Sequence, residues 1–398
     1  MNESPRSIRL QIAIFGKRNA GKSSLINAIT NQDLAVVSSI AGTTTDPVLK
    51  SMEISPLGPV TIIDTPGIDD EGELGQLRVQ KAQAVISKTN VIILVIAADS
   101  TPNQHEQTIV TNAIERKIPV IGVMSKADVV ADTQAIENWF HQHNIEYCKV
   151  NSITQNGIDT LKQLLVKNSP ANFQPETIVG DLIKPLDTII LICPVDAGAP
   201  KSRLILPQVQ VMRDILDNGG IAIVITEKGI EATLAKLKEP PALVITDSQV
   251  FAQIAPQIPA DVPLTSFSIL FARYKGDLDE FMRGIAAIRQ LKVGDKVLIA
   301  EACTHYPSHE DIGRVKIPRW LEKTVGGKLE FSFAVGGEFA QDLTQYQLIV
   351  HCGGCMINRA ELLSRIKDCQ KAQVPVVNYG ILIGHMTGIL ERVIQPLK

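Results

Sequence analysis

The sequence predicts three consecutive α/β domains with mostly parallel sheets. Apolar segments of strand length alternate with helix-length segments along most of the 398 residues, which is the pattern of βαβ units. A chain of this length is too long for a single hydrophobic core. A glycine-rich loop joins the first strand to the first helix, an arrangement typical of phosphate-binding α/β domains.

The glycine-rich loop is the segment Gly16-Lys17-Arg18-Asn19-Ala20-Gly21-Lys22-Ser23-Ser24. Its spacing, Gly-x-x-x-x-Gly-Lys-Ser between an apolar run and a helix-forming run, is that of a P-loop. Gly16 and Gly21 allow the backbone to curl so that successive N–H groups face one anion. We expect Lys22 to reach the β- and γ-phosphates of a nucleotide and Ser23 to bind Mg²⁺.

The rest of the first domain continues the alternation. Strands are predicted at 48–54, 60–63, 91–97, 120–124 and up to 150, and helices at 77–87, 104–116, 134–143 and 158–166. The strand at 60–63 ends in Asp64-Thr65-Pro66-Gly67, where Asp64 suits a Mg²⁺ contact and the Gly67 N–H could approach a γ-phosphate. The strand at 120–124 runs into Ser125-Lys126-Ala127-Asp128. A mostly parallel sheet with right-handed crossovers places these loops at its carboxyl edge.

Composition limits the possible partners and location. The net charge of -3 and an aromatic content of 4% give no reason to expect nucleic-acid binding. The longest apolar run, at 91–98, is too short to cross a membrane, and the N-terminus lacks signal-peptide architecture. We therefore expect a cytoplasmic protein that contacts no membrane. In that compartment the six cysteines are expected to be thiols or metal ligands.

A break in the pattern at 169–176 marks a domain boundary. The predicted domains are 1–170, 178–267 and 268–398. The middle domain has predicted strands at 188–193, 222–226, 243–246 and 263–267, with helices at 207–216, 229–237 and 249–254. It has no phosphate loop, so we predict a dimerisation module. The apolar and basic stretch at 199–208 fits either core packing or an interface.

The third domain carries two groups of potential metal ligands. Its strands are predicted at 296–300, 330–335, 347–350 and 375–378, and its helices at 269–274, 278–290, 317–324, 359–372 and 382–393. Cys303-Thr304-His305 follows the first strand, and His351-Cys352-Gly353-Gly354-Cys355 follows the third. Parallel strands bring both segments to one edge, so three cysteines and two histidines should converge.

Three interpretations of this convergence remain open. The cysteines could be buried structural thiols. Cys303, His305, Cys352 and Cys355 could form a structural Zn²⁺ site. Alternatively, the three cysteines could hold an iron–sulfur cluster with an exchangeable fourth position, for which His305, His351 and Glu338 are candidates. Cys148 and Cys369 are expected to stay outside the site.

The order of motifs in the first domain resembles that of Era/TrmE-like GTPases. This resemblance implies a P-loop GTPase fold that binds GTP or GDP with Mg²⁺. Thr44, in Gly-Thr-Thr-Thr-Asp, matches the switch I threonine that binds Mg²⁺. Asp128 would bind guanine, with Lys126 and Ser152 beside it. Ser125 departs from the pattern, because asparagine is usual there, and Asn151-Ser152-Ile153 replaces the usual Ser-Ala.

The residue after Gly67 is Ile68, where many GTPases have a glutamine that orients water. An isoleucine cannot orient water, so GTP hydrolysis is expected to be slow. Asn19 matches the P-loop asparagine with which relatives hold K⁺, and the resemblance therefore implies K⁺-stimulated hydrolysis. The predicted catalytic residues are Lys22, Asn19, Thr44 and Gly67. The predicted nucleotide-binding residues are Gly16, Asn19, Ala20, Gly21, Lys22, Ser23, Ser24, Thr44, Asp64, Gly67, Lys126, Asp128 and Ser152.

A P-loop GTPase joined to Cys-x-His and a later His-Cys-x-x-Cys resembles the FeFe-hydrogenase maturation GTPases, the HydF family. The resemblance covers the whole chain. It implies that Cys303, Cys352 and Cys355 hold a 4Fe-4S cluster, with His305 or His351 as a possible labile ligand. It further implies a homodimer or tetramer.

The same resemblance implies a scaffold that receives a transient di-iron subcluster precursor and passes it to apo FeFe-hydrogenase. The expected partners are the radical-SAM maturases HydE and HydG and the apo-hydrogenase. Two alternatives remain. One is a ribosome- or tRNA-associated regulatory GTPase with a structural zinc site. The other is an assembly module with a degenerate nucleotide site.

Overall fold

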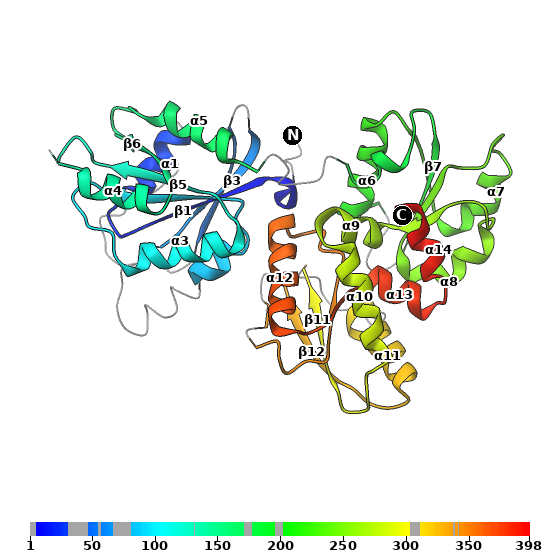
Figure 1. Cartoon of the computed structure of the whole chain (residues 1–398). Coiled ribbons are helices and arrows are strands. Elements are labelled where there is room, and N and C mark those ends of the chain that lie inside the picture. The colour runs from blue at the N-terminus through cyan, green and yellow to red at the C-terminus, as the bar shows by residue number, and fades with distance from the viewer. Residues whose placement is uncertain are drawn as a thin grey trace. The chain divides into compact units, whose positions relative to one another are not determined.

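The computed structural model describes residues 5–30, 47–54, 57–66, 81–130, 132–170, 177–195, 202–302, 311–336, 339–340 and 342–398. The predicted site residues Thr44, Gly67, Cys303 and His305, and the candidate Glu338, lie outside these ranges. The chain forms two compact units, Met1–Phe173 and Gln174–Lys398. Figure 1 shows the elements of both units.

The first unit contains a six-stranded sheet in the order β2-β3-β1-β4-β5-β6, in which only β2 is antiparallel to its neighbour. Its strands are β1 Leu10–Gly16, β2 Val48–Ile54, β3 Gly58–Asp64, β4 Val91–Ala97, β5 Val120–Ser125 and β6 Glu146–Val150. Its helices are α1 Lys22–Thr30, α3 Gln104–Arg116, α4 Gln134–Gln142 and α5 Ile158–Asn168. The predicted α/β class with a mostly parallel sheet is confirmed.

Burial explains why the central strands form where the sequence is continuously apolar. All seven residues of β1 and all seven of β4 are buried, as a parallel sheet covered on both faces requires.

At the start of α3, Asn103 and Glu106 form a capping box. The Asn103 side chain accepts from the His105 N–H at 2.9 Å, and the Glu106 carboxylate accepts from the Asn103 N–H at 2.9 Å.

The second unit contains two parallel four-stranded sheets, ordered β10-β9-β7-β8 and β12-β11-β13-β14. The first comprises β7 Thr188–Ile192, β8 Ile221–Ile225, β9 Leu243–Thr246 and β10 Leu264–Ser266, with α6 Leu206–Asp217, α7 Ile230–Leu234, α8 Phe251–Ile254 and α9 Phe267–Lys275. The second comprises β11 Lys296–Glu301, β12 Glu330–Val335, β13 Leu348–His351 and β14 Val376–Asn378, with α10 Leu278–Ile288, α11 Ile317–Val325, α12 Arg359–Ala372, α13 Tyr379–Met386 and α14 Leu390–Ile394.

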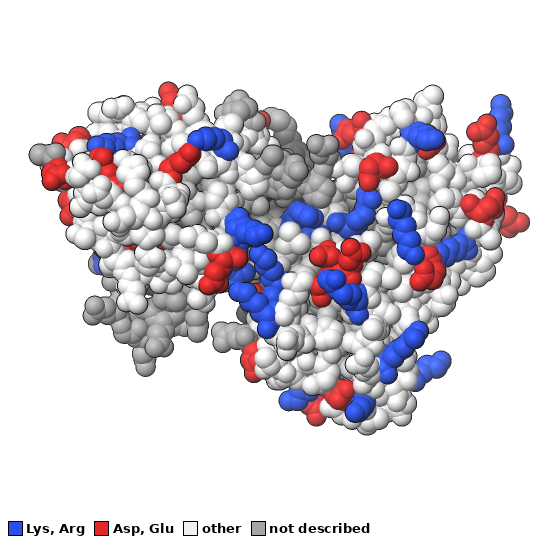
Figure 2. Space-filling model, viewed as in Figure 1, with Lys and Arg blue, Asp and Glu red and all other residues white. Residues whose placement is uncertain are grey.

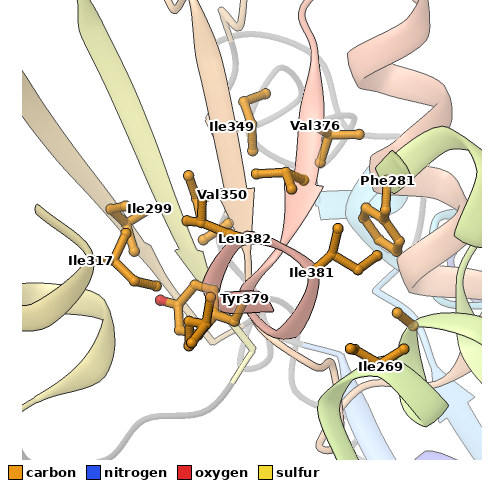
Figure 3. Close-up of a cluster of buried hydrophobic side chains, with 14 of the residues drawn as sticks. Ile269, Phe281, Ile299, Ile317, Ile349, Val350, Val376, Tyr379, Ile381 and Leu382 are labelled. Carbon is orange, nitrogen blue, oxygen red and sulfur yellow. The ribbon is translucent and has the colours of Figure 1, made fainter. Parts of the chain in front are cut away.

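The two sheets of the second unit share one hydrophobic core. It includes Ile190 of β7 and Val244 of β9 together with residues of the other sheet. Figure 3 shows part of this core, where Ile269 of α9 and Phe281 of α10 lie near Ile381 of α13. The division of this unit at residues 267 and 268 therefore stays a prediction.

The helices predicted at 229–237 and 249–254 are shorter in the structure, where they are α7 and α8. The last predicted helix is divided. The single helix predicted at 382–393 is two helices, α13 and α14. The break falls at Gly388, whose φ of 75° lies in the left-handed region, where a helix cannot continue. The glycine inside the predicted helix is the sequence signal for this break.

Candidate nucleotide site and candidate metal centre

The P-loop connects the end of β1 to the start of α1. Gly16 has a φ of 157°, and a Cβ at this position would overlap with the carbonyl oxygen of Val95 on β4. Gly21 has a φ of 87°. Both glycines are therefore needed for backbone reasons, and the loop leads directly into the N-terminus of α1, a favourable position for phosphate.

The amine of Lys22 lies within the curl of this loop. The side chain is 9% exposed, and Nζ donates hydrogen bonds to the carbonyl oxygens of Gly16, at 2.9 Å, and Lys17, at 2.8 Å. Ser23 and Ser24 follow in the first turn of α1 and are partly exposed, and Ala20 is buried. The positive charge is thus held where a phosphate would meet the loop.

Asp64 lies at the end of β3, next to β1 in the sheet. Burial raises the pKa of its carboxyl group, and the nearby charges of Lys22 and Lys50 oppose this rise. Asp64 therefore lies within the electrostatic reach of the P-loop lysine, as a Mg²⁺ contact requires.

Asn19, the predicted K⁺ residue, is exposed with a left-handed φ of 59°.

A hydrogen bond connects the predicted base-binding loop to the P-loop, and its donor is Ser125, the residue that departs from the GTPase pattern. The Ser125 hydroxyl donates to the carbonyl oxygen of Ala20 at 2.7 Å. Lys126 has a left-handed φ of 54°, and its Nζ lies 3.2 Å from an Asp99 oxygen. Asp128 is exposed, so its carboxylate is accessible to a ligand.

Ser152, the last predicted base contact, lies in a turn after β6. The preceding Asn151 side chain accepts from the N–H groups of Ile153, at 2.9 Å, and Thr154, at 3.0 Å. This turn fixes the backbone around Ser152, which is partly exposed.

The candidate metal centre lies at the carboxyl edge of the second parallel sheet of unit two. β11 and β13 are neighbours, and Ala300 is in register with His351. The Sγ atom of Cys352 accepts from the N–H of Ala302 at 3.1 Å and from the N–H of Gly354 at 3.5 Å. Cys303 follows Ala302 directly in the sequence.

Burial favours the neutral thiol form of both described cysteines of this turn. Burial raises the pKa of Cys352, and the N–H groups of Ala302 and Gly354 oppose this effect. Burial, together with the charge of Cys352, raises the pKa of Cys355 to about 11. Metal binding would therefore release protons from these thiols.

His351 has protein partners at both ring nitrogens. Nδ1 lies 2.8 Å from the carbonyl oxygen of Cys352, and Nε2 lies 3.3 Å from Nη1 of Arg365. A guanidinium group can only donate, so Nε2 accepts and Nδ1 carries the proton. Burial and the Arg365 charge lower the pKa of His351 to about 3. His351 would have to give up a partner to bind iron.

Sequence reasoning missed Arg365. Its Nη2 donates to the Glu361 carboxylate at 2.8 Å and to the carbonyl oxygen of Gly336 at 2.7 Å. An i,i+4 pair on α12 was visible in the sequence, but its burial beside His351 was not.

Within the described ranges, no three His, Cys, Asp or Glu side chains are placed so that they could hold a metal ion. Cys303 and His305 lie outside those ranges, so the predicted ligand set as a whole stays a prediction. The donor chemistry fits an iron–sulfur cluster, because backbone N–H groups already point at a thiol sulfur.

Family models match the second unit along nearly its whole length. A model described as the hydrogen maturase F dimerization domain matches residues 178–276, and one described as the hydrogen maturase F tetramerization domain matches residues 279–396. Together they cover more than half of the chain. The chain belongs to the hydrogen maturase F family. The family that the sequence resembles is thus confirmed.

A third model, described as a 50S ribosome-binding GTPase, matches residues 11–126. It confirms that the first domain of this chain is a P-loop GTPase domain. The chain is 33% identical over 161 residues to the tRNA modification GTPase MnmE of Histophilus somni and 33% identical over 162 residues to that of a Janthinobacterium species. These matches cover 39% and 40% of this chain but only 34% of each relative, so the chain spans about a third of their length.

Solved structures similar to this chain include Era of Aquifex aeolicus bound to GDP.AlF4-. It is 20% identical, with a TM-score of 0.36, and the match covers 54% of this chain and 93% of that one. A bacterial selenocysteine-specific elongation factor EF-Sec is 22% identical, with a TM-score of 0.35, over 40% of this chain and 28% of that one.

Among the described residues, no helix is both long and apolar enough to cross a membrane.

Proposed function

We propose that this protein is a GTP-hydrolysing scaffold that holds a 4Fe-4S cluster and delivers a di-iron subcluster precursor to apo FeFe-hydrogenase. The observation that carries the proposal is the hydrogen bond from the Ala302 N–H to Cys352 Sγ. It brings the residue before Cys303 into contact with the first cysteine of the Cys-x-x-Cys turn. Membership in the hydrogen maturase F family supports the same role.

In this proposal Cys303, Cys352 and Cys355 hold the cluster, and one iron stays open to an exchangeable ligand. When bound, the cluster supplies an iron that can share a bridging ligand with the precursor. His305 is the preferred labile ligand, because His351 already has partners at both ring nitrogens. The N–H groups of Ala302 and Gly354 stabilise negative charge on the Cys352 sulfur.

The GTPase domain would use the P-loop residues to bind GTP and Mg²⁺. Lys22 would leave its two carbonyl partners for the β- and γ-phosphates, and Ser23 and Thr44 would bind Mg²⁺, with Asp64 nearby. We propose slow hydrolysis stimulated by K⁺ that Asn19 helps to hold. The expected result is faster turnover in KCl than in NaCl, and equal rates in the two salts would contradict the K⁺ role.

We further propose that the chain forms a homodimer or tetramer in the cytoplasm and exchanges cargo with the maturases HydE and HydG. The printed names of the two matched domains support self-association. In the first four-stranded sheet of unit two, β8 is an edge strand with Ile221 46% and Val224 41% exposed. Such an edge can pair with a second copy of the chain.

Anaerobic reconstitution with iron and sulfide tests the proposal. The reduced protein should give an S = 1/2 EPR signal of the 4Fe-4S type, which Cys303→Ala should abolish and Cys148→Ala should leave intact. Imidazole should shift the signal if one iron is open. Stoichiometric zinc without an iron–sulfur signal would contradict the scaffold and favour the alternative, a regulatory GTPase with a zinc site.

A further inference from the structure

The Cys352–Cys355 turn lies where two hydrophobic cores of the second unit meet. Cys352 packs against the core that the two sheets share. Cys355 packs against a second cluster that includes Phe271 and Tyr274 of α9. α9 belongs to the region matched by the dimerization model, whereas the cysteines belong to the region matched by the tetramerization model. One helix of the first region therefore supports the cysteine turn of the second.

Lys275, the last residue of α9, makes the central contact. It is 1% exposed, and its Nζ donates to three carbonyl oxygens of the turn: Gly354 at 3.3 Å, Cys355 at 3.0 Å and Ile357 at 2.8 Å. An ammonium group has three N–H donors. All three are used by the turn, so Lys275 has none left for a substrate.

These bonds orient the peptide groups of the turn. The carbonyl groups of Gly354 and Cys355 share their planar peptide units with the N–H groups of Cys355 and Met356, and these N–H groups oppose the rise in the pKa of the Cys355 thiol. Gly354 has a left-handed φ of 65°, and its N–H points at Cys352 Sγ at 3.5 Å. The turn thus directs three carbonyl groups at the Lys275 ammonium group and the Gly354 N–H at the Cys352 sulfur.

The C-terminal turn of α9 also has hydrogen bonds to residues outside the cysteine turn. Arg273 donates to the Asp181 carboxylate, at 2.6 and 3.0 Å, and to the carbonyl oxygen of Ile178 at 3.0 Å. Phe271 lies beside Lys275, with the ring centroid 5.3 Å from Nζ. The helical turn that carries Lys275 therefore has contacts of its own besides those with the cysteine turn.

We propose that Lys275 is the positioning residue of the Cys352–Cys355 turn, which it holds in the shape that presents both thiols to a cluster. This inference rests on the proposed cluster function. A buried ammonium group also stabilises the negative charge that bound thiolates carry. The dimerization domain of the family thus contributes a residue to the cluster site of the neighbouring domain.

The first experiment uses the metal-free full chain and compares hydrogen exchange of the amides at 353–358. Lys275→Met removes charge and donors with little change in length, and we expect exchange in this turn to rise by about tenfold or more. Lys296→Met is the matched control: Lys296 is half-exposed and lies 3.9 Å from Glu330. It should leave the turn unchanged. Unaltered exchange in Lys275→Met would overturn the inference.

The second experiment reconstitutes the same proteins with iron and sulfide and measures iron content, EPR spectrum and midpoint potential. Lys275→Met should lose iron, or shift the potential to more negative values, because a positive charge near the site is gone. Lys275→Gln keeps an N–H donor without the charge, so it should retain more iron than Lys275→Met but show the same direction of shift.

The outcomes separate the two proposals. No iron–sulfur signal in the wild type contradicts the proposed function, and the exchange experiment still decides the role of Lys275. A wild-type signal that Lys275→Met and Lys275→Gln reproduce in content, spectrum and potential contradicts the role of Lys275 alone. If Lys275→Met exchanges rapidly throughout unit two, it is misfolded, and Lys275→Gln then decides the result.

Discussion

The hydroxyl of Ser125 donates a hydrogen bond of 2.7 Å to the carbonyl oxygen of Ala20 in the P-loop. Ser125 is 5% exposed. A Cβ atom added to Gly21 would lie 3.7 Å from the Ser125 side chain, so the serine also packs close to this glycine. The serine that departs from the GTPase pattern therefore connects the P-loop to the predicted base-binding loop.

Ser125→Ala should weaken nucleotide binding, because the buried Ala20 carbonyl loses its donor. Such a loss costs about 1–3 kcal/mol, and we expect about tenfold weaker GDP binding by fluorescence titration. Thr111→Ala serves as the control, since the Thr111 hydroxyl also bonds a backbone carbonyl, at 2.9 Å, but on the exposed face of α3. Equal affinities in both variants would show that this hydrogen bond is dispensable.

Gly16→Ala should abolish GDP binding, because a methyl group at this position overlaps with the Val95 carbonyl oxygen. The measurement is nucleotide titration alongside thermal unfolding. Gly294→Ala is the control for backbone strain alone. Gly294 has a φ of 90° with no atom within 4 Å of its Cβ position, so only the strain of about 1–3 kcal/mol applies. Wild-type binding by Gly16→Ala would contradict the P-loop geometry.

Val224→Lys should shift the oligomer toward monomer in analytical ultracentrifugation. A lysine on the β8 edge blocks strand pairing and disfavours burial. Val48→Lys is a matched control, because Val48 is also 41% exposed and also lies on an edge strand, β2. Dissociation by both variants, or by neither, would argue against β8 as the interface.

Arg365→Met should destabilise the protein, because it leaves the Glu361 carboxylate buried without its cation. The side chains of Arg365 and Glu361 are 5% and 9% exposed. Breaking a buried pair costs about 3–5 kcal/mol, measured by denaturant unfolding. Arg213→Met breaks an i,i+4 pair with Asp217 whose side chains are 74% and 51% exposed, and it should cost much less, because water screens this pair. Similar losses in both variants would contradict this ranking.

Cys148, Cys193 and Cys369 should resist alkylation at pH 8 in the native protein. Burial raises the pKa of Cys148 to about 11 and that of Cys193 and Cys369 to about 12, so almost no reactive thiolate exists at pH 8. Mass spectrometry after iodoacetamide treatment should detect labelling of these residues only after unfolding. Rapid labelling of any of these cysteines in the native protein would contradict its buried position.

Much of the fold could be predicted from the sequence. The apolar run at 91–97 is β4 at the predicted bounds, because a fully buried parallel strand must be continuously apolar. The predicted helix at 359–372 is α12, whose start is capped by Asn358. The predicted helix at 382–393 divides at Gly388, because the left-handed φ of this glycine is a local backbone feature that hydrophobic periodicity does not detect.

The candidate sites were predicted in part. The P-loop and the cysteine turn are local patterns, and their residue types are dictated by phosphate and metal chemistry. The roles of Ser125, Arg365 and Lys275 could not be predicted, because their partners are 105, 14 and up to 82 residues away in the sequence.

The sequence by itself determined which segments become strands and helices and which loops carry the candidate phosphate- and metal-binding residues. These properties depend on periodicity and on short motifs, which neighbouring residues fix. Only the tertiary structure decided that Ser125 braces the P-loop and that Lys275 supports the Cys352–Cys355 turn. Both contacts bring polar atoms from distant segments into a water-poor interior, where each buried carbonyl needs a donor and the fold determines which side chain supplies it.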